Sequence, residues 1–284
     1  MLILGFLLIA IESKFKYISP ILHDTCLSFS PQSLQKELYQ GIVCGKNLES
    51  RRLIDLFATT GLLHLLVVSG SHLLALAALA KKLRLRGEFI NAICLLYAFL
   101  CLLEPPISRA YLFISLDTFQ RKHSLQWSPW HQHFMAILLC LTMFPDWLSS
   151  LSFQLSILCA FAISLAKKYT DFWIYLTLFP ALLILGNYHP LSILINLSLG
   201  PLLGLLLFPL SALSFVIPNL YLCVDLIWDL LIKVLTLVSG YLKSDSSNVV
   251  KYSPLILWLY IICLWFLGKN NFYANRKSTY STES

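Results

Sequence analysis

Four polar side chains lie close together in an otherwise apolar run, GLLHLLVVSGSHLLAL at residues 61–76; they are His64, Ser69, Ser71 and His72. Histidine and serine can pass protons or attack a carbonyl group. A proton-linked transporter and an intramembrane hydrolase therefore both stay open. The hydrolase would also need a group that orients the histidine, and the sequence does not identify one.

The tripeptide Ser69-Gly70-Ser71 gives these residues a second, structural interpretation. Glycine has weak helix propensity and serine competes for backbone hydrogen bonds, so together they favour a break in a helix. We expect a kink between two half-helices, each of which carries one histidine. The alternative is that both histidines bond to neighbouring helices, with the small residues allowing close packing.

A double proline separates two charges in EPPISRAYLFISLD, residues 104–117. Because proline interrupts a helix, we expect the chain to turn between Glu104 and Arg109. The guanidinium of Arg109, which follows Ser108, can pair with Glu104 or offer its planar fork to a phosphate. The alternative is that Arg109 extends to the membrane interface while Glu104 is solvated.

Polar residues are dense in PDWLSSLSFQLSILCA, residues 145–160, where Gln154 and Ser156 follow Phe153. Glutamine and serine can hold helices together by hydrogen bonds, and they can also line an aqueous path. Their density here favours the path.

Three charged residues, Asp225, Asp229 and Lys233, recur every four positions and so share one helix face. Asp229 and Lys233 have the favourable order for a helical ion pair, which leaves Asp225 in need of another partner. A proton or ion pathway is one interpretation. We favour a packed face that is turned towards other helices.

Two of the eight cysteines, Cys26 and Cys44, lie in the one long polar segment. They can form a disulfide if that segment faces an oxidising compartment, and otherwise they are two thiols. The other six lie singly in apolar runs, where cysteine acts as a small hydrophobic residue. No metal-ligand spacing occurs, so we expect neither a metal nor another cofactor.

The chain as a whole has 284 residues, of which 58% are hydrophobic and 12% charged, with a mean hydropathy of +0.74. A soluble domain would carry about a quarter charged residues. We therefore expect an all-α, polytopic transmembrane bundle of about 8–10 membrane segments, some of them re-entrant. The expected spans are 58–80, 88–104, 107–120, 134–148, 151–166, 170–186, 191–208, 220–241 and 254–268.

Basic residues give the expected orientation, because cytoplasmic loops are enriched in lysine and arginine. If the first span runs inward, eleven basic residues fall on the cytoplasmic side: Lys81, Lys82, Arg84, Arg86, Arg121, Lys122, Lys167, Lys168, Lys269, Arg276 and Lys277. The opposite side after residue 58 holds Arg109, Lys243 and Lys251. This asymmetry explains the net charge of +7 better than a nucleic-acid ligand does.

Three regions follow from this organisation. Residues 1–57 hold a short apolar segment and a polar outer segment, in which SPQSLQKELYQGIVCG reads as a short amphipathic helix that ends at Gly41. Residues 58–268 form the transmembrane domain, and residues 269–284 form a cytoplasmic tail.

These motifs, in this order, resemble the ComEC family of competence proteins. The resemblance rests on TTGLLHLLVVSGSHL (59–73), YAFLCLLEPPISRAYLFISL (97–116), FPDWLSSLSFQLSILCA (144–160) and INLSLGPLLGLLLFP (195–209). It implies a channel core, not an enzyme, that takes up single-stranded DNA across the bacterial inner membrane during natural transformation. The candidate residues of the DNA path are His64, Ser69, Gly70, His72, Ser108, Arg109, Phe153, Gln154, Ser156 and Asn196.

The resemblance also implies partners. These are single-stranded DNA, the DNA receptor and cytoplasmic translocation proteins of competence, a separate metallo-β-lactamase-like nuclease, and further copies of this chain. Trp127 and Trp130 in the loop LQWSPWHQH can stack bases or anchor the chain at the membrane interface. The competing functions remain a small-solute or proton-linked transporter using His64, His72, Asp117 and Asp225, and the intramembrane hydrolase.

Overall fold

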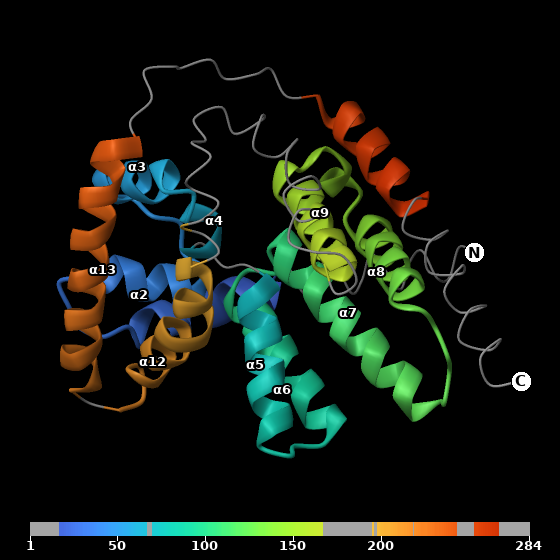
Figure 1. Cartoon of the computed structure of the whole chain (residues 1–284). Helices are drawn as coiled ribbons and strands as arrows, with labels where there is room; N and C mark the ends of the chain where they lie inside the picture. The colour runs from blue at the N-terminus through green and yellow to red at the C-terminus, as the bar shows by residue number, and fades with distance from the viewer. Residues whose placement is uncertain are drawn as a thin grey trace, which may run out of the picture. The chain divides into compact units, whose positions relative to one another are not determined.

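The computed structural model describes residues 17–66, 70–166, 195, 198–217, 219–242 and 253–266. Every regular element in these ranges is a helix, which confirms the all-α expectation for this part of the chain (Figure 1). The chain divides into two compact units. The first unit comprises Met1–Ile114 and Asn187–Asn248, and the second comprises Ser115–Gly186 and Val249–Ser284.

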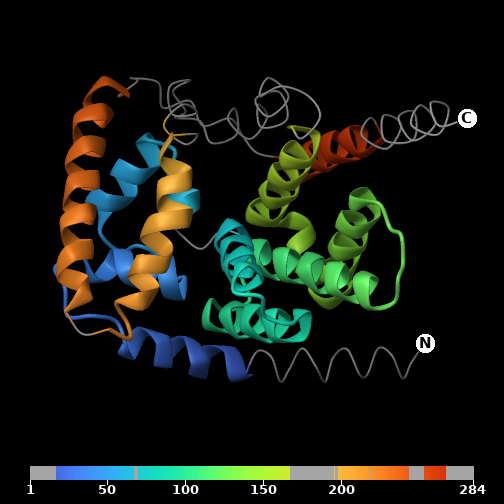
Figure 2. The same ribbon diagram turned by 60° about the horizontal axis from the view of Figure 1, so that its bottom comes forward.

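The first unit is built from helices of different lengths (Figure 2), and their buried apolar side chains form one core. In chain order they are a helix at 17–28, α2 (Lys36–Tyr39), the π-helix η1 (Gln40–Cys44), α3 (Arg51–Thr59), α4 (Leu63–Leu66), α5 (Gly70–Lys82), α6 (Gly87–Leu100), the start of α7 (Pro105–Lys122), the π-helix η3 (Leu202–Leu207), α12 (Phe208–Leu213) and α13 (Leu220–Leu242). The largest side chains buried in the core are Tyr39, Phe57 and Trp228.

The second unit holds the rest of α7, α8 (Pro129–Met143), the 3-10 helix η2 (Pro145–Ser149), α9 (Leu151–Ala166) and a helix at 254–266. Ser128 begins α8, because its hydroxyl accepts a hydrogen bond from the His131 amide and the next residue is a proline. Phe161 of α9 packs against Trp130 of α8, with ring centroids 5.1 Å apart.

Seven of the expected spans overlap helices in the described ranges: α5, α6, α7, α8, α9, α13 and the helix at 254–266. The span expected at 170–186 lies outside the described residues, as do residues 191–194, 196 and 197 of the one expected at 191–208. The described end of that span holds η3 and the first residue of α12. In the portions of the chain with a described conformation, no helix is both long enough and apolar enough to traverse a membrane.

The short helix expected to end at Gly41 continues as η1 and ends at Gly45 instead. Gly45 has a φ of 78°, a left-handed conformation that favours glycine at a helix end. At Gly41, where the helix was expected to end, a Cβ atom would lie 3.4 Å from the Lys46 carbonyl oxygen.

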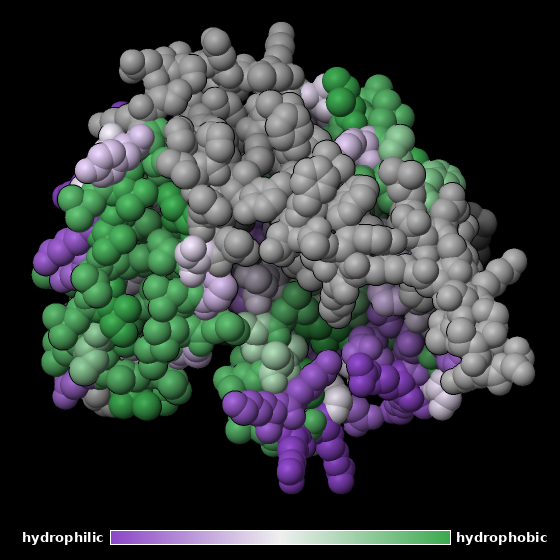
Figure 3. Space-filling model, viewed as in Figure 1, coloured by the Kyte–Doolittle hydropathy of each residue, from purple (hydrophilic) through white to green (hydrophobic). Residues whose placement is uncertain are grey.

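Helix α13 has two chemically different faces. On one face, Asp225 accepts hydrogen bonds from Ser33 Oγ (2.7 Å) and Tyr39 OH (2.9 Å), and Asp229 accepts one from Gln35 Nε2 (2.7 Å). The expected ion pair with Lys233 is replaced by the bond from Gln35. Large apolar side chains are exposed elsewhere on the helix, over which Figure 3 shows a hydrophobic surface; they are Leu222, Leu226, Leu230, Val234, Leu237 and Tyr241.

Candidate functional site

Gly70, the first residue of α5, lies against the first turn of α7. A Cβ atom at Gly70 would lie 3.0 Å from the Pro106 carbonyl oxygen, 3.0 Å from Ala110 Cβ and 3.8 Å from Arg109 Nη2. The absence of a side chain therefore allows the two helices to approach closely. It also lets the Arg109 guanidinium lie next to the backbone of α5.

Arg109 itself is buried, with 7% of its surface exposed. The turn expected between Glu104 and Arg109 lies earlier, at residues 101–104, where Leu102 and Leu103 have positive φ angles of 57° and 52°. The two prolines begin α7 instead of interrupting it, because the first turn of a helix does not need their missing amide hydrogens. Arg109 is consequently fixed on a helix, one turn from its start.

Ser108 helps to define this start of α7. Its hydroxyl donates a 2.7 Å hydrogen bond to the carbonyl oxygen of Leu103, which lies in the preceding turn. Ser108 is itself buried. The serine thus connects the turn to the helix and supports the position of the neighbouring arginine.

His72, two residues after Gly70, is completely buried among aromatic rings. Its imidazole stacks on Phe208 of α12 with centroids 4.8 Å apart and an interplanar angle of 23°. Phe208 also makes an edge contact with Tyr97 of α6, at 5.5 Å. His72 therefore connects the Gly70 contact to the core of the first unit.

The candidate residues of the first unit thus form one group: Gly70 and His72 on α5, and Ser108 and Arg109 on α7. His64 belongs to α4, so the two histidines occur on separate helices, α4 and α5. Ser69, in the segment between these helices, and Asn196 lie outside the described residues.

The other three candidates, Phe153, Gln154 and Ser156, are on α9 in the second unit. Gln154 is fully buried, and its Nε2 donates to the carbonyl oxygens of Leu148 (3.0 Å) and Pro254 (3.3 Å). Trp258 Nε1 donates to the same Leu148 oxygen at 2.7 Å. These contacts give Gln154 a role in holding α9, η2 and the last described helix together, where the sequence pattern favoured an aqueous path.

The outer segment is fastened to α13 by Tyr39, a residue that the sequence pattern did not single out; its hydroxyl donates to Asp225 and to the Tyr221 carbonyl oxygen. Cys26 and Cys44, the pair that the sequence offered for a disulfide, are joined by one within the outer segment. Burial, followed by the hydrogen bond and charge of Asp225, raises the pKa of Tyr39 well above its ordinary value. The phenol remains a hydrogen-bond donor as a result. The sequence offered one indication of this contact, namely that Asp225 had no partner on its own helix face.

Within the described ranges, no group of three or more histidine, cysteine, aspartate or glutamate side chains is arranged to hold a metal ion.

The sequence pattern of the competence protein family, described as "Competence protein", matches residues 43–273. This range covers most of the chain. The chain belongs to the competence protein family. The match confirms the resemblance to ComEC-type proteins and supports a role in competence and DNA uptake. No curated protein and no solved structure matches the chain.

In this competence protein, the matched range includes the Gly70–Arg109 contact of the first unit and the Gln154 contacts of the second. It also includes Asp225, but the helix at 17–28 and Tyr39 precede it. The contacts that fasten the outer segment therefore join a part of the chain before the family match to a helix within it.

Proposed function

We propose that this competence protein is the membrane-channel core through which one DNA strand passes to the cytoplasmic side of the bacterial inner membrane. The observation that carries the proposal is the buried guanidinium of Arg109 beside Gly70. A DNA strand carries one negative charge per phosphate, and a guanidinium presents a planar set of donors that matches phosphate oxygens.

Burial distinguishes Arg109 from the other lysines and arginines whose side chains the structure describes. Lys81, Arg84 and Arg86 are exposed, and their positions are explained by the orientation of the chain in the membrane. Removing an arginine from water costs several kcal/mol unless partners compensate, so buried charges in membrane segments commonly have a function. The family role in DNA uptake supports phosphate as the ligand of Arg109.

Three further observations support a location in the membrane. Exposed apolar side chains recur on α13, from Leu222 to Tyr241, and an apolar surface of this kind suits contact with lipid. Basic residues are concentrated in every second loop between the expected spans, that is, on one side of the expected membrane. The Cys26–Cys44 disulfide suits an outer segment in an oxidising compartment. In this proposal the DNA receptor, the cytoplasmic translocation proteins and the nuclease for the other strand are separate proteins.

Replacement of Arg109 tests the proposal. We expect Arg109→Ala to lower transformation about 10- to 100-fold, which corresponds to the loss of one hydrogen bond to a charged group. Arg109→Lys keeps the charge but not the fork and should give an intermediate value. His72→Ala should also reduce transformation, because it removes the ring that packs on Phe208. The measurement is transformation frequency, normalised to the amount of protein in the membrane.

Arg86→Ala is the matched control, since Arg86 is exposed and precedes α6. It should leave transformation near the wild-type frequency. Normal transformation by both Arg109→Ala and His72→Ala would contradict the channel assignment. Proton or solute flux in liposomes, combined with unimpaired DNA uptake in the variants, would instead support the transporter.

A further inference from the structure

The last turn of α7 and the connection from it to α8 carry accessible aromatic rings beside basic side chains. The Phe119 ring lies 4.4 Å from that of His123 and 6.4 Å from that of Trp127, measured between centroids. Phe119 is 48% exposed, His123 is exposed and Trp127 is half-buried. We refer to Phe119, Arg121, Lys122, His123 and Trp127 as the aromatic–basic cluster; all five belong to the second unit.

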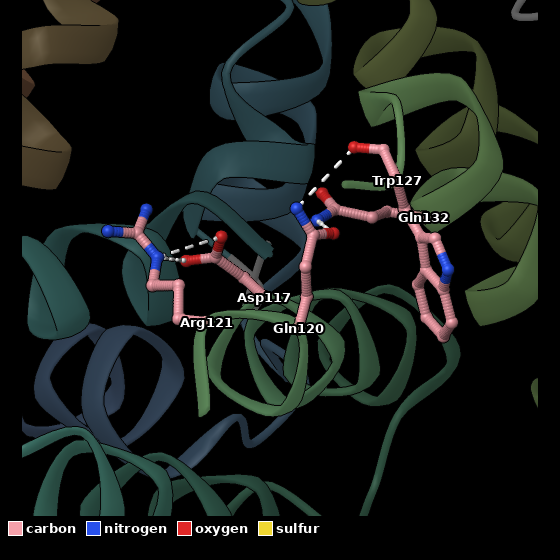
Figure 4. A network of polar contacts seen from close by, with 5 residues as sticks. All are labelled: Asp117, Gln120, Arg121, Trp127 and Gln132. Carbon is pink, nitrogen blue, oxygen red and sulfur yellow. Dashed lines mark hydrogen bonds and ion pairs between the residues drawn. The ribbon is translucent and has the colours of Figure 1, made fainter. Parts of the chain in front are cut away.

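The cations of the cluster are accessible to a ligand. The Arg121 side chain is 72% exposed, and Lys122 is exposed next to it. Arg121 Nε donates to both carboxylate oxygens of Asp117, at 3.1 and 3.2 Å. Figure 4 shows the two terminal nitrogens of Arg121 pointing away from Asp117. One edge of the guanidinium is thus anchored by Asp117 while the terminal nitrogens face outward.

A polar network fixes the loop that carries Trp127. Gln132 Nε2, from a buried side chain on α8, donates to Gln120 Oε1, and Gln120 Nε2 donates to the Trp127 carbonyl oxygen at 3.5 Å (Figure 4). Ser128, the next residue, caps α8. The indole of Trp127 points away from the amide that holds its backbone (Figure 4). Such preorganisation lowers the entropy that a ligand must overcome on binding.

We propose that the aromatic–basic cluster binds the single DNA strand where it leaves the channel. Bases stack on Phe119 and Trp127, and phosphates pair with Arg121 and Lys122. Aromatic faces with adjacent cations are the usual means of binding single strands of any sequence, because every base has a stacking face. The site rests on the proposed function and adds the point at which the strand is held on the cytoplasmic side, where the basic residues place this loop.

Oligonucleotide binding by the purified full chain in detergent tests the cluster. The probe is fluorescently labelled oligothymidylate, and its anisotropy is measured over a series of salt concentrations. We expect Phe119→Ala and Trp127→Ala each to weaken binding about tenfold, as for the loss of one stacked base. Arg121→Gln should reduce the slope of log K against log salt by about 0.7.

Matched controls come from α6 and the residue that precedes it. Phe89→Ala removes an aromatic side chain that is 60% exposed, and Arg86→Gln removes one exposed positive charge. Neither should weaken binding more than about twofold. A loss of affinity as large in these controls as in the cluster variants would show general charge and surface effects, and it would overturn the site.

Two other outcomes decide between the cluster and its alternatives. Unchanged affinity in Phe119→Ala and Trp127→Ala overturns the site. If Trp127→Ala also lowers the amount of protein in the membrane while its DNA affinity is unchanged, Trp127 is an interfacial anchor. The failure of the channel proposal is distinguishable. If the cluster variants lose affinity while Arg109→Ala transforms normally, the cluster binds DNA but the channel path through Arg109 is wrong.

Discussion

At the scale of single residues, Gly70 has the most sharply defined requirement. The atoms that a Cβ would meet at 3.0 Å include the Pro106 carbonyl oxygen, which belongs to the backbone and cannot rotate away. Gly240 of α13 offers a contrast, since a Cβ there would meet nothing within 4 Å. The close packing of the two helices therefore excludes a larger side chain at Gly70, whereas the space around Gly240 can hold one.

Gly70→Ala should destabilise the protein because it forces α5 and α7 apart. We expect the free energy of unfolding to fall by about 1–3 kcal/mol, the usual cost of an added methyl group in a packed site. Gly240→Ala should raise it by up to about 1 kcal/mol, because alanine favours the helix. Thermal unfolding in detergent measures both, and transformation frequency should fall only for Gly70→Ala. Equal stability of the two variants would contradict the close contact.

At the scale of elements, hydrogen bonds fix the polar outer segment to α13, and a disulfide joins two parts of that segment to each other. Hydrogen bonds from Ser33 and Tyr39 reach Asp225, and the Cys26–Cys44 disulfide joins the helix at 17–28 to η1. The cysteines are 18 residues apart in the sequence, so the disulfide closes a short loop. α13 therefore serves as a support for the outer segment on one face while its apolar side chains remain exposed elsewhere.

Loss of the disulfide should destabilise the outer segment that α13 supports. We expect Cys26→Ser together with Cys44→Ser to lower the free energy of unfolding by about 3 kcal/mol, as for a closed loop of this length. A reducing agent should lower the thermal midpoint of the wild type and leave that of the double variant unchanged. The control is Cys223→Ser with Cys263→Ser, since both of these cysteines are free and exposed. A wild-type midpoint that does not respond to reduction would count against the bond.

At the scale of the whole molecule, the chain combines two compact helical units with a family match that reaches into both. The buried Arg109 belongs to the first unit, and the aromatic–basic cluster belongs to the second. The proposed topology, which rests on the charge pattern, predicts different sides of the membrane for two segments of the chain. The outer segment carries the disulfide, whereas the last turn of α7 carries Arg121 and Lys122.

Reporter fusions test this topology in cells. Alkaline phosphatase, which is active only outside the cytoplasm, should be active when it is fused after Asn47 and inactive after Ser124. A fluorescent protein that folds only in the cytoplasm should give the reverse result at the same two positions. The expectation follows from the positive-inside rule applied to Lys81–Arg86 and Arg121–Lys122. Equal phosphatase activity at both sites would contradict the orientation.

The sequence by itself determined the helical class, several helix positions and the family. The helix expected at 151–166 is α9 at Leu151–Ala166, and the one expected at 220–241 is α13 at Leu220–Leu242. These features depend on apolar runs, prolines and helix caps, each of which involves only a few neighbouring residues. Four short motifs in a fixed order were likewise sufficient for the resemblance that the family match confirmed.

Only the tertiary structure decided which partners the polar residues have. Asp225 lacked a partner in the sequence because Ser33 is 192 residues away, and Gln154 bonds to Pro254 at a separation of 100 residues. Two element ends also differed from expectation. The short helix ends at Gly45 and not at Gly41, and Pro105 and Pro106 begin α7 where a turn was expected. Spacing in the sequence predicts which residues share a helix face. Contacts between distant segments depend instead on how the helices pack, and this packing places Arg109 beside Gly70.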